Sequence, residues 1–395
     1  MTQSKYVFSS SIVKIINTNC ALNDFCNNLV DTDFITVDTE FIREKTYWPK
    51  LCLLQIAGKK TFAAIDPLAS DIDLEPVFKL FKNPRIIKVF HASRQDLEIF
   101  FNLTGHLPSP IFDTQVAAMV CGFGDSIGYE QLVLKLTGIQ VDKTSRFTDW
   151  SLRPLTNKQI SYALSDVIHL RPVYEKILIR LEQTNRSSWI KEEMSILTRR
   201  ETYEGDPSDA YKRFKSRSSN RKFLAILREL AAWRERQAQS RNVPRNRILK
   251  DDSIIQIANS KPKDTEQLAL VRGLGKKISE GDYGNQILTC IKVASLIPND
   301  KCPKIDEKIE IPQGIGPIVD ILKVLLKLKS EEFEVAGKLI AKISDIEQIA
   351  AFGEDANVPA LKGWRRNIFG NDAITLRSGQ SYLTIEGNKI AVRSF

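Results

Sequence analysis

The sequence predicts a mixed α/β domain, in which helices flank a sheet, followed by two small helical domains. Short apolar or β-branched runs alternate with helix-like segments over residues 1 to about 197. A polar, strongly basic break follows at 199–220, and helical periodicity dominates from Arg221 onward. Strands that alternate with helices favour a layered α/β core, whereas sustained helical periodicity indicates all-α modules.

Five short runs rich in β-branched and apolar residues predict the strands of the first domain. They are "SIVKIINT", "FITVDTEF", "LCLLQIAG", "TFAAIDP" and "RIIKVFH". Three of them (34–41, 51–57 and 61–66) follow one another closely, which predicts antiparallel neighbours. The helices of this domain are predicted at about 73–82, 94–103, 113–121, 128–136 and 157–183.

Breaks in composition set the expected domain boundaries. We expect the first domain at 1–198, a basic linker at 199–220, a helical domain at 221–298 and a second helical domain at 299–395. The final segment, "SYLTIEGNKIAVRSF", has two short strand-like runs around Gly387-Asn388, which predicts a hairpin.

The composition excludes several classes of protein. The chain has 395 residues, of which 43% are hydrophobic, and no apolar run long enough to predict a membrane span. Its first residues lack the apolar stretch and the small-residue cleavage site of a secretory signal. The six cysteines are scattered without a C-x-x-C pair, which disfavours a zinc site and favours reduced thiols in a cytoplasmic protein.

Positive charge is concentrated in one segment. The net charge of the chain is +9, and residues 199–250 hold fifteen Lys/Arg against six Asp/Glu, so the remainder is balanced. Such a segment is either the footprint of a polyanion binder or a solvated helix surface. If it contacts nucleic acid, its loop "RNVPRNRIL" offers Arg241, Arg245 and Arg247 as phosphate contacts.

Two carboxylates interrupt the apolar run "FITVDTEFI" (34–42). In a strand, Asp38 and Glu40 point to the same face, where like charges repel and lose hydration unless that face is solvated. Other acids have similarly apolar neighbours, which favours a buried cluster. Asp96 lies in the first turn of a predicted helix, and Tyr162 and Asp166 share one face of another.

Carboxylates that converge on one point need cations to neutralise them. Oxygen ligands without histidine or thiolate favour Mg²⁺ or Mn²⁺. Two such ions can clamp the attacking and leaving oxygens of a phosphodiester displacement. The sequence therefore predicts that divalent cations, Mg²⁺ or Mn²⁺, neutralise the paired acids.

The order and context of these motifs resemble the DEDD exonucleases of the tyrosine subtype and, within them, the ribonuclease D family. The resemblance rests on "VDTEFIREKTYWPKLCLLQIA", "FHASRQDLEIF" and "SRFTDWSLRPLTNKQISYALSDVIHL". Residues 223–262 resemble an HRDC domain, and the last domain resembles one loosely. The resemblance spans nearly the whole chain and implies a ribonuclease H-like exonuclease domain followed by two HRDC-type domains.

The resemblance also implies a role for each acid. Asp38 would bridge both metal ions, and Asp96 would act on one of them, largely through water. Glu40 and Asp166 would complete the other ion, which activates the attacking water. Tyr162 would hydrogen-bond that water. All five positions match the family's motifs.

By the same resemblance, the chain is a metal-dependent 3′-to-5′ exoribonuclease that releases single nucleotides. Its partners would be RNAs with a single-stranded 3′ end, tRNA precursors among them, and not membranes. Two alternatives stay open: a DNA exonuclease of the same superfamily, and a nucleic-acid-binding scaffold with an inactive nuclease fold. The sequence has no helicase phosphate loop, which weakens the first, and it keeps all four acids, which weakens the second. Ser161, before Tyr162, excludes the histidine subtype.

Three further expectations concern residues outside the cluster. Asp113 is expected to cap the helix that follows it. Tyr47 and Trp48 could stack on bases or pack in a core. Arg234 falls near the apolar side of its helix beside Trp233 and is expected to be buried and paired.

Overall fold

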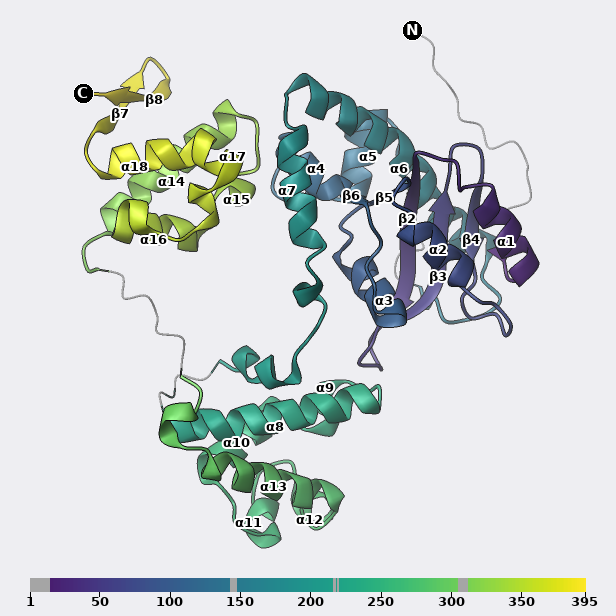
Figure 1. The fold of residues 1–395 in the computed structure, drawn as a ribbon, viewed down its shortest axis with the longest axis vertical. Helices are drawn as coiled ribbons and strands as arrows, with labels where there is room; N and C mark the ends of the chain where they lie inside the picture. The colour runs from purple at the N-terminus through teal and green to yellow at the C-terminus, as the bar shows by residue number, and fades with distance from the viewer. Residues whose placement is uncertain (1–14, 143–147, 216–217, 219, 305–311) are drawn as a thin grey trace. The chain divides into compact units, whose positions relative to one another are not determined.

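The computed structural model describes residues 15–142, 148–215, 218, 220–304 and 312–395 (Figure 1). These residues form two compact units. The first unit comprises the described residues up to Glu40, together with 52–198 and 312–395. The second comprises 41–51 and the described part of 199–304. The loop that follows the strand of the paired acids therefore belongs to the second unit.

A six-stranded mixed sheet forms the core of the first unit. Its strands are β1 (Ile15–Ile16), β2 (Phe34–Ile42), β3 (Lys50–Ala57), β4 (Phe62–Ile65), β5 (Ile87–Phe90) and β6 (Ile111–Asp113). Their order is β1-β4-β3-β2-β5-β6. β3 and β4 are antiparallel, whereas the pairs β1–β4, β2–β5 and β5–β6 are parallel. The strand with the paired acids, β2, thus lies inside the sheet, between β3 and β5.

The prediction of a mixed sheet is confirmed. The three strands predicted at 34–41, 51–57 and 61–66 are β2, β3 and β4, and they are neighbours in the sheet. Residues 11–14 of the first predicted strand lie outside the described residues. Strand β6 could not be predicted from the sequence, because three residues that run straight into a helix are too short for a recognisable period.

In the part of the first domain that the structure describes, seven helices accompany the sheet. They are α1 (Asn19–Asn27), α2 (Glu75–Lys82), α3 (Arg94–Thr104), α4 (Thr114–Val120), α5 (Tyr129–Thr137), α6 (Asn157–Gln183) and α7 (Ser187–Leu197). The predicted helices correspond to α2 through α6. The long helix α6 begins with a capping box, in which Thr156 and Gln159 each bond the backbone N–H of the other. It packs against β4 and β5.

Two contacts hold α6 against β2. The Thr36 hydroxyl donates to the Val167 carbonyl at 2.7 Å. Further along the helix, the Arg171 guanidinium lies 4.1 Å from the centre of the Phe34 ring. Because Asp166 immediately precedes Val167, these contacts bring its carboxylate to the strand of the paired acids.

The last part of the first unit is a helical subdomain that ends in a hairpin. It contains α14 (Gly316–Glu332), α15 (Gly337–Ile340), α16 (Ile343–Phe352), α17 (Gly363–Arg365), α18 (Asn371–Arg377), β7 (Ser381–Glu386) and β8 (Lys389–Ser394). The two strands pair around Gly387-Asn388, which confirms the predicted hairpin. Trp364 stacks on Trp189 of α7 with ring centres 4.4 Å apart, and the Arg365 guanidinium binds the Glu193 carboxylate at 2.5 Å. These contacts join the subdomain to the helix that follows α6.

The second unit is helical. It contains α8 (Arg221–Ser240), α9 (Arg245–Ile248), α10 (Asp251–Ser260), α11 (Thr265–Ala269), α12 (Gly275–Ser279) and α13 (Asp282–Leu296). A 3-10 helix, Pro207–Arg213, lies against α8, and Tyr211 and Phe214 pack on the apolar core. Part of the expected linker at 199–220 is therefore integral to this unit, because its aromatic residues bury apolar surface there. None of the described helices is long and apolar enough to cross a membrane.

Arg234 is a charged side chain that α8 buries. Its guanidinium is almost inaccessible and donates to the Leu249 carbonyl at 2.8 Å. It also forms an ion pair with Asp251 at 2.6 Å. The prediction of a buried, paired arginine is confirmed.

Candidate active site

Three carboxylates from two elements converge beside the sheet. Along β2, Thr39 is buried, whereas Asp38 and Glu40 on either side of it are partly exposed. Asp166 reaches the same place from α6. One carboxylate oxygen from each of Asp38, Glu40 and Asp166 lies within 4.8 Å of the other two. Asp38 and Glu40, which share one face of β2, thus lie beside Asp166, which follows Glu40 by 126 residues in the chain.

Asp96 is the fourth predicted acid, and it lies in the first turn of α3 with 7% of its surface exposed. The Thr39 hydroxyl donates to its carboxylate. Burial raises the pKa of Asp96 well above its ordinary range, and the nearby charge of Asp38 raises it further, although the Thr39 hydrogen bond lowers it. Burial also raises the pKa of Asp38 to about 6. The two acids are therefore electrostatic neighbours.

Asp113 holds the turn that leads into α3. Its carboxylate caps α4 by accepting from the backbone N–H of Gln115 at 2.8 Å, which confirms the predicted cap. It also accepts from the backbone N–H groups of Ala92 at 3.1 Å and Ser93 at 2.7 Å. Ala92 has a φ of +59°, a left-handed conformation that a residue with a Cβ rarely adopts. Asp113 thus stabilises a strained turn only a few residues before Asp96.

Aromatic residues surround the α6 side of the cluster. Tyr162 lies one turn before Asp166 on α6, and its ring centre is 6.1 Å from that of the buried Trp150. The Tyr129 hydroxyl donates to the backbone carbonyl of Asp166 at 2.6 Å. Burial raises the pKa of Tyr129 well above its usual value, and the charges of Asp166 and Asp38 raise it further. Tyr129 therefore stays protonated as a donor that holds this turn of α6.

The donor set fits a hard divalent cation. The converging atoms are carboxylate oxygens, which are the ligands that Mg²⁺ and Mn²⁺ prefer. The raised pKa values of Asp38 and Asp96 mean that the folded chain stabilises their charged forms poorly. A cation at this position would lower both pKa values and relieve the repulsion between the acids.

The three arginines of the basic loop occupy different environments. The Arg245 guanidinium forms an ion pair with Glu235 at 2.6 Å and donates to the Tyr47 hydroxyl at 3.0 Å. It also lies 4.6 Å from the centre of the Tyr47 ring. Arg241 and Arg247 are exposed. Arg245 is therefore engaged in holding the second unit together, and Arg241 and Arg247 are the more accessible of the three.

Tyr47 packs in the second unit. Its ring lies against the apolar core of that unit, and its hydroxyl donates to Glu235. Backbone N–H groups of Tyr47 and Trp48 donate to the Asn242 side chain at 3.1 and 3.0 Å. Of the two expectations for Tyr47, the structure supports packing.

Sequence reasoning missed the residues that support the cluster. Thr39 and Tyr129 each hydrogen-bond one of the acids or its backbone, and Trp150 lies beside Tyr162. The position of Thr39 between two acids on a strand could have indicated that its hydroxyl binds a carboxylate. No sequence pattern indicates the roles of Tyr129 and Trp150, because their partners are distant in sequence.

Comparison with known proteins agrees with the geometry. Residues 13–182 match the family model described as 3′-5′ exonuclease, and residues 223–291 match the HRDC domain. The ribonuclease D of Gluconacetobacter diazotrophicus is 45% identical over 376 residues, which are 95% of this chain and 95% of that protein. The ribonuclease D of Granulibacter bethesdensis is 47% identical over 366 residues, which are 92% of each chain.

A solved structure shares the fold over almost the whole chain. The crystal structure of Escherichia coli RNase D, described as an exoribonuclease involved in structured RNA processing, superposes with a TM-score of 0.81 at 28% identity. The match covers 93% of this chain and 99% of that one. With relatives at such identity along their full length, and with an acidic cluster set in an exonuclease fold, the chain belongs to the ribonuclease D family of 3′-5′ exoribonucleases.

Proposed function

We propose that this exoribonuclease acts through two divalent metal ions, Mg²⁺ or Mn²⁺, held by Asp38, Glu40, Asp96 and Asp166. The observation that carries the proposal is the meeting of three carboxylates within 4.8 Å, together with the raised pKa values of Asp38 and Asp96. Asp38, Glu40 and Asp166 would hold one ion, and Asp38 with Asp96 would hold the other. When bound, such cations supply positive charge for the phosphodiester displacement and lower the pKa of water.

The side chains around the acids orient the reactants. Tyr162 donates a hydrogen bond to the attacking water, because a tyrosine with a pKa near 10 orients water at neutral pH better than it deprotonates it. Thr39 fixes the Asp96 carboxylate, and Tyr129 fixes the turn of α6 that carries Asp166. Each of these residues acts by holding a group in place.

We further propose that the substrates are structured RNAs with a single-stranded 3′ end, including tRNA precursors, in the cytoplasm. Two observations support this substrate class. The E. coli relative is described as processing structured RNA. The basic segment 199–250 of this chain offers exposed arginines, among them Arg241 and Arg247.

The last domain is proposed to be a divergent HRDC-like domain.

The test is hydrolysis by the full chain of three matched substrates in the presence of Mg²⁺. They are a tRNA precursor with a single-stranded 3′ extension, the same precursor with that extension base-paired, and a single-stranded DNA of the extension's sequence. We expect stepwise release of nucleotides from the first and little from the other two. Faster release from the DNA would contradict the RNA assignment, and equal release from the paired extension would contradict the need for a single-stranded end.

A further inference from the structure

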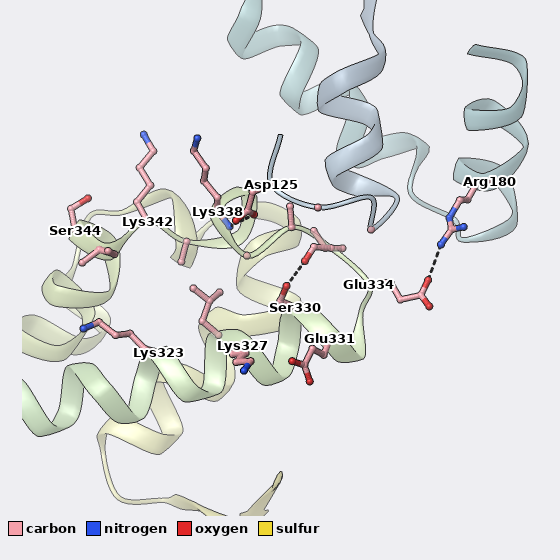
Figure 2. Close-up of a pocket in the computed structure, with 18 residues that line it drawn as sticks. Asp125, Arg180, Lys323, Lys327, Ser330, Glu331, Glu334, Lys338, Lys342 and Ser344 are labelled. Atoms are coloured by element: carbon pink, nitrogen blue, oxygen red, sulfur yellow. Dashed lines mark hydrogen bonds and ion pairs between the residues drawn. The ribbon is translucent and has the colours of Figure 1, made fainter. Parts of the chain in front are cut away.

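A groove of about 1070 Å³ lies in the first unit, outside the acidic cluster. Figure 2 shows the residues that line it: one side comes from the turn after α4 and from Arg180 of α6, and the other from α14 and the segment that leads through α15 into α16. Its cationic lining residues are Arg180, Lys323, Lys327, Lys338 and Lys342. Asp125, Glu331 and Glu334 are its acidic ones. The groove therefore has an excess of positive charge.

The walls of the groove are held together by specific contacts. The backbone N–H of Ala336 donates to the Met119 carbonyl at 2.9 Å. The backbone N–H of Lys338 donates to the Asp125 carboxylate at 3.3 Å, and Arg180 forms an ion pair with Glu334 at 2.9 Å (Figure 2). The groove is thus a fixed feature of the docking between the turn after α4 and the C-terminal subdomain.

Local pairing accounts for some of these charges but not for three lysines. Glu334 neutralises Arg180, and Asp320 lies 3.1 Å from the Lys323 ammonium. Among the described residues, Lys327, Lys338 and Lys342 have no ion-pair partner, and all three side chains are exposed. Three exposed ammonium groups along one groove create an attractive potential for an anion with several charges.

The chemistry of the lining favours a phosphate backbone over bases. Leu326, Val335 and Ala341 supply its apolar part, and none of the described residues that line it is an aromatic on which a base could stack. Lysine ammonium groups act as point charges that bind phosphate without reading sequence. The volume is large enough for a short stretch of polynucleotide backbone.

We propose that this groove binds the phosphodiester backbone of the RNA substrate, at nucleotides other than the one being removed. The proposal rests on the proposed function, because it assumes an RNA substrate. It adds a binding surface on the C-terminal subdomain that is separate from the basic segment 199–250. Its interactions are electrostatic, so they raise affinity for long RNA irrespective of sequence.

The test compares two triple variants in the full chain, each in an Asp38→Asn background that prevents hydrolysis during binding. The groove variant is Lys327→Gln, Lys338→Gln and Lys342→Gln. The matched control is Lys59→Gln, Lys60→Gln and Lys79→Gln, which removes the same charge from exposed lysines of the first unit outside the groove. Binding of a tRNA-sized RNA is measured over a range of salt concentrations.

We expect the groove variant alone to bind more weakly and to show a weaker dependence on salt. The slope of log K against log salt should flatten by roughly 0.7 for each phosphate that is no longer bound, or by about two for all three. A version with arginine at the three positions should restore binding. Equal slopes for the groove and control variants would overturn the proposal.

A second measurement, on the Asp38→Asn chain with all its lysines intact, guards against misfolded lysine variants. Acylation of surface lysines, read by mass spectrometry, should fall at Lys327, Lys338 and Lys342 when RNA is added and stay constant at Lys59 and Lys60. Unchanged acylation of the groove lysines would overturn the proposal. Protection by a polyglutamate peptide as strong as that by RNA would assign the groove to acidic protein segments. Because the parent's hydrolysis of RNA is measured separately, failure of the groove would leave the proposed function standing.

Discussion

Two groups of charged side chains in this protein, one around Glu235 and one around Asp38 and Asp96, have opposite electrostatics. In the second unit, burial alone would raise the pKa of Glu235, but hydrogen bonds from Arg245, Tyr47 and Arg213 lower it to about 2. In the first unit, burial raises the pKa of Asp38 to about 6, and that of Asp96 rises well above its ordinary range. Glu235 has its counter-charges within the chain, whereas the groups that shift Asp96 are mainly other acids and a threonine.

The difference distinguishes a structural cluster from a functional one. A carboxylate paired with arginines is satisfied once the chain folds and has no need of a ligand. Carboxylates that repel one another where water has little access are poorly stabilised until a cation binds, and such perturbed pKa values are typical of functional sites. The comparison therefore favours the acidic cluster over Glu235 as the proposed metal site.

The largest expected effect comes from removing one charge from each cluster. Asp38→Asn should slow RNA hydrolysis by about a thousandfold or more, because loss of the proposed shared metal ligand would remove several kcal/mol of transition-state stabilisation. Glu235→Gln should instead lower the free energy of unfolding by about 1–3 kcal/mol, because it weakens charge-assisted hydrogen bonds to two partly exposed arginines. Hydrolysis rates and urea unfolding of both variants measure this contrast. Asp38→Asn activity within tenfold of the parent would remove the basis for the metal site.

The next effect is on the melting temperature, measured in the presence of chelator. The Asp38→Asn and Glu235→Gln variants should shift it in opposite directions near neutral pH. The folded-state pKa of Asp38 is above its ordinary value of 3.8, so its ionisation destabilises the fold as pH rises through 6. Asp38→Asn should therefore raise the melting temperature at pH 7–8 and change it little at pH 4. The folded-state pKa of Glu235 is below its ordinary value of 4.5, so its contribution is present above that value and lost as pH falls toward 2.

Glu235→Gln should accordingly lower the melting temperature at pH 7 more than at pH 3. If both variants shifted the melting temperature in the same direction at pH 7, the opposite pKa shifts of Asp38 and Glu235 would be contradicted.

A smaller effect is expected at Tyr162. Tyr162→Phe should keep metal affinity and slow hydrolysis by roughly ten- to a hundredfold, since one positioning hydrogen bond is worth about 1–3 kcal/mol. Single-turnover rates and calorimetric titration of Mn²⁺ on the same variant decide whether Tyr162 orients the attacking water or only packs against its neighbours. Rates equal to those of the parent would make Tyr162 a packing partner of Trp150.

The smallest effects are expected among the loop arginines. Substitutions of Arg241 and Arg247 should affect RNA binding, whereas substitution of Arg245 should affect stability. Arg241→Ala with Arg247→Ala should weaken binding of long RNA and flatten its salt dependence by roughly 0.7 per phosphate, with little change in unfolding. Arg245→Ala should mainly lower stability, because Glu235 and Tyr47 lose a partner. A salt slope unchanged by the double variant would make this loop a solvated surface.

The parts of the site that could be predicted from sequence are those set by local periodicity. The alternation of β2 puts Asp38 and Glu40 on one face, and the turn of α6 puts Tyr162 and Asp166 on another. Both patterns need only a few consecutive residues. The position of Asp113 before its helix predicts the cap for the same reason.

The rest depends on how distant segments meet. Tyr47 follows the strand of the paired acids, yet its hydroxyl donates to Glu235, 188 residues further along the chain. The environment of Arg245 and the role of Tyr129 likewise arise from partners that no local pattern specifies. The packing of 207–214 on α8 overrides a polar, basic composition that indicated a linker.

The most direct test of the metal site is release of nucleotides from 3′-labelled single-stranded RNA by the full chain, first in excess chelator and then after addition of a divalent cation. We expect no release in chelator, recovery with Mg²⁺ or Mn²⁺, and little turnover with Ca²⁺, whose looser coordination geometry positions reactants poorly. The Asp38→Asn variant should not recover with either metal. Full release in excess chelator would contradict the account, because the acidic cluster would then serve a reaction that needs no cation.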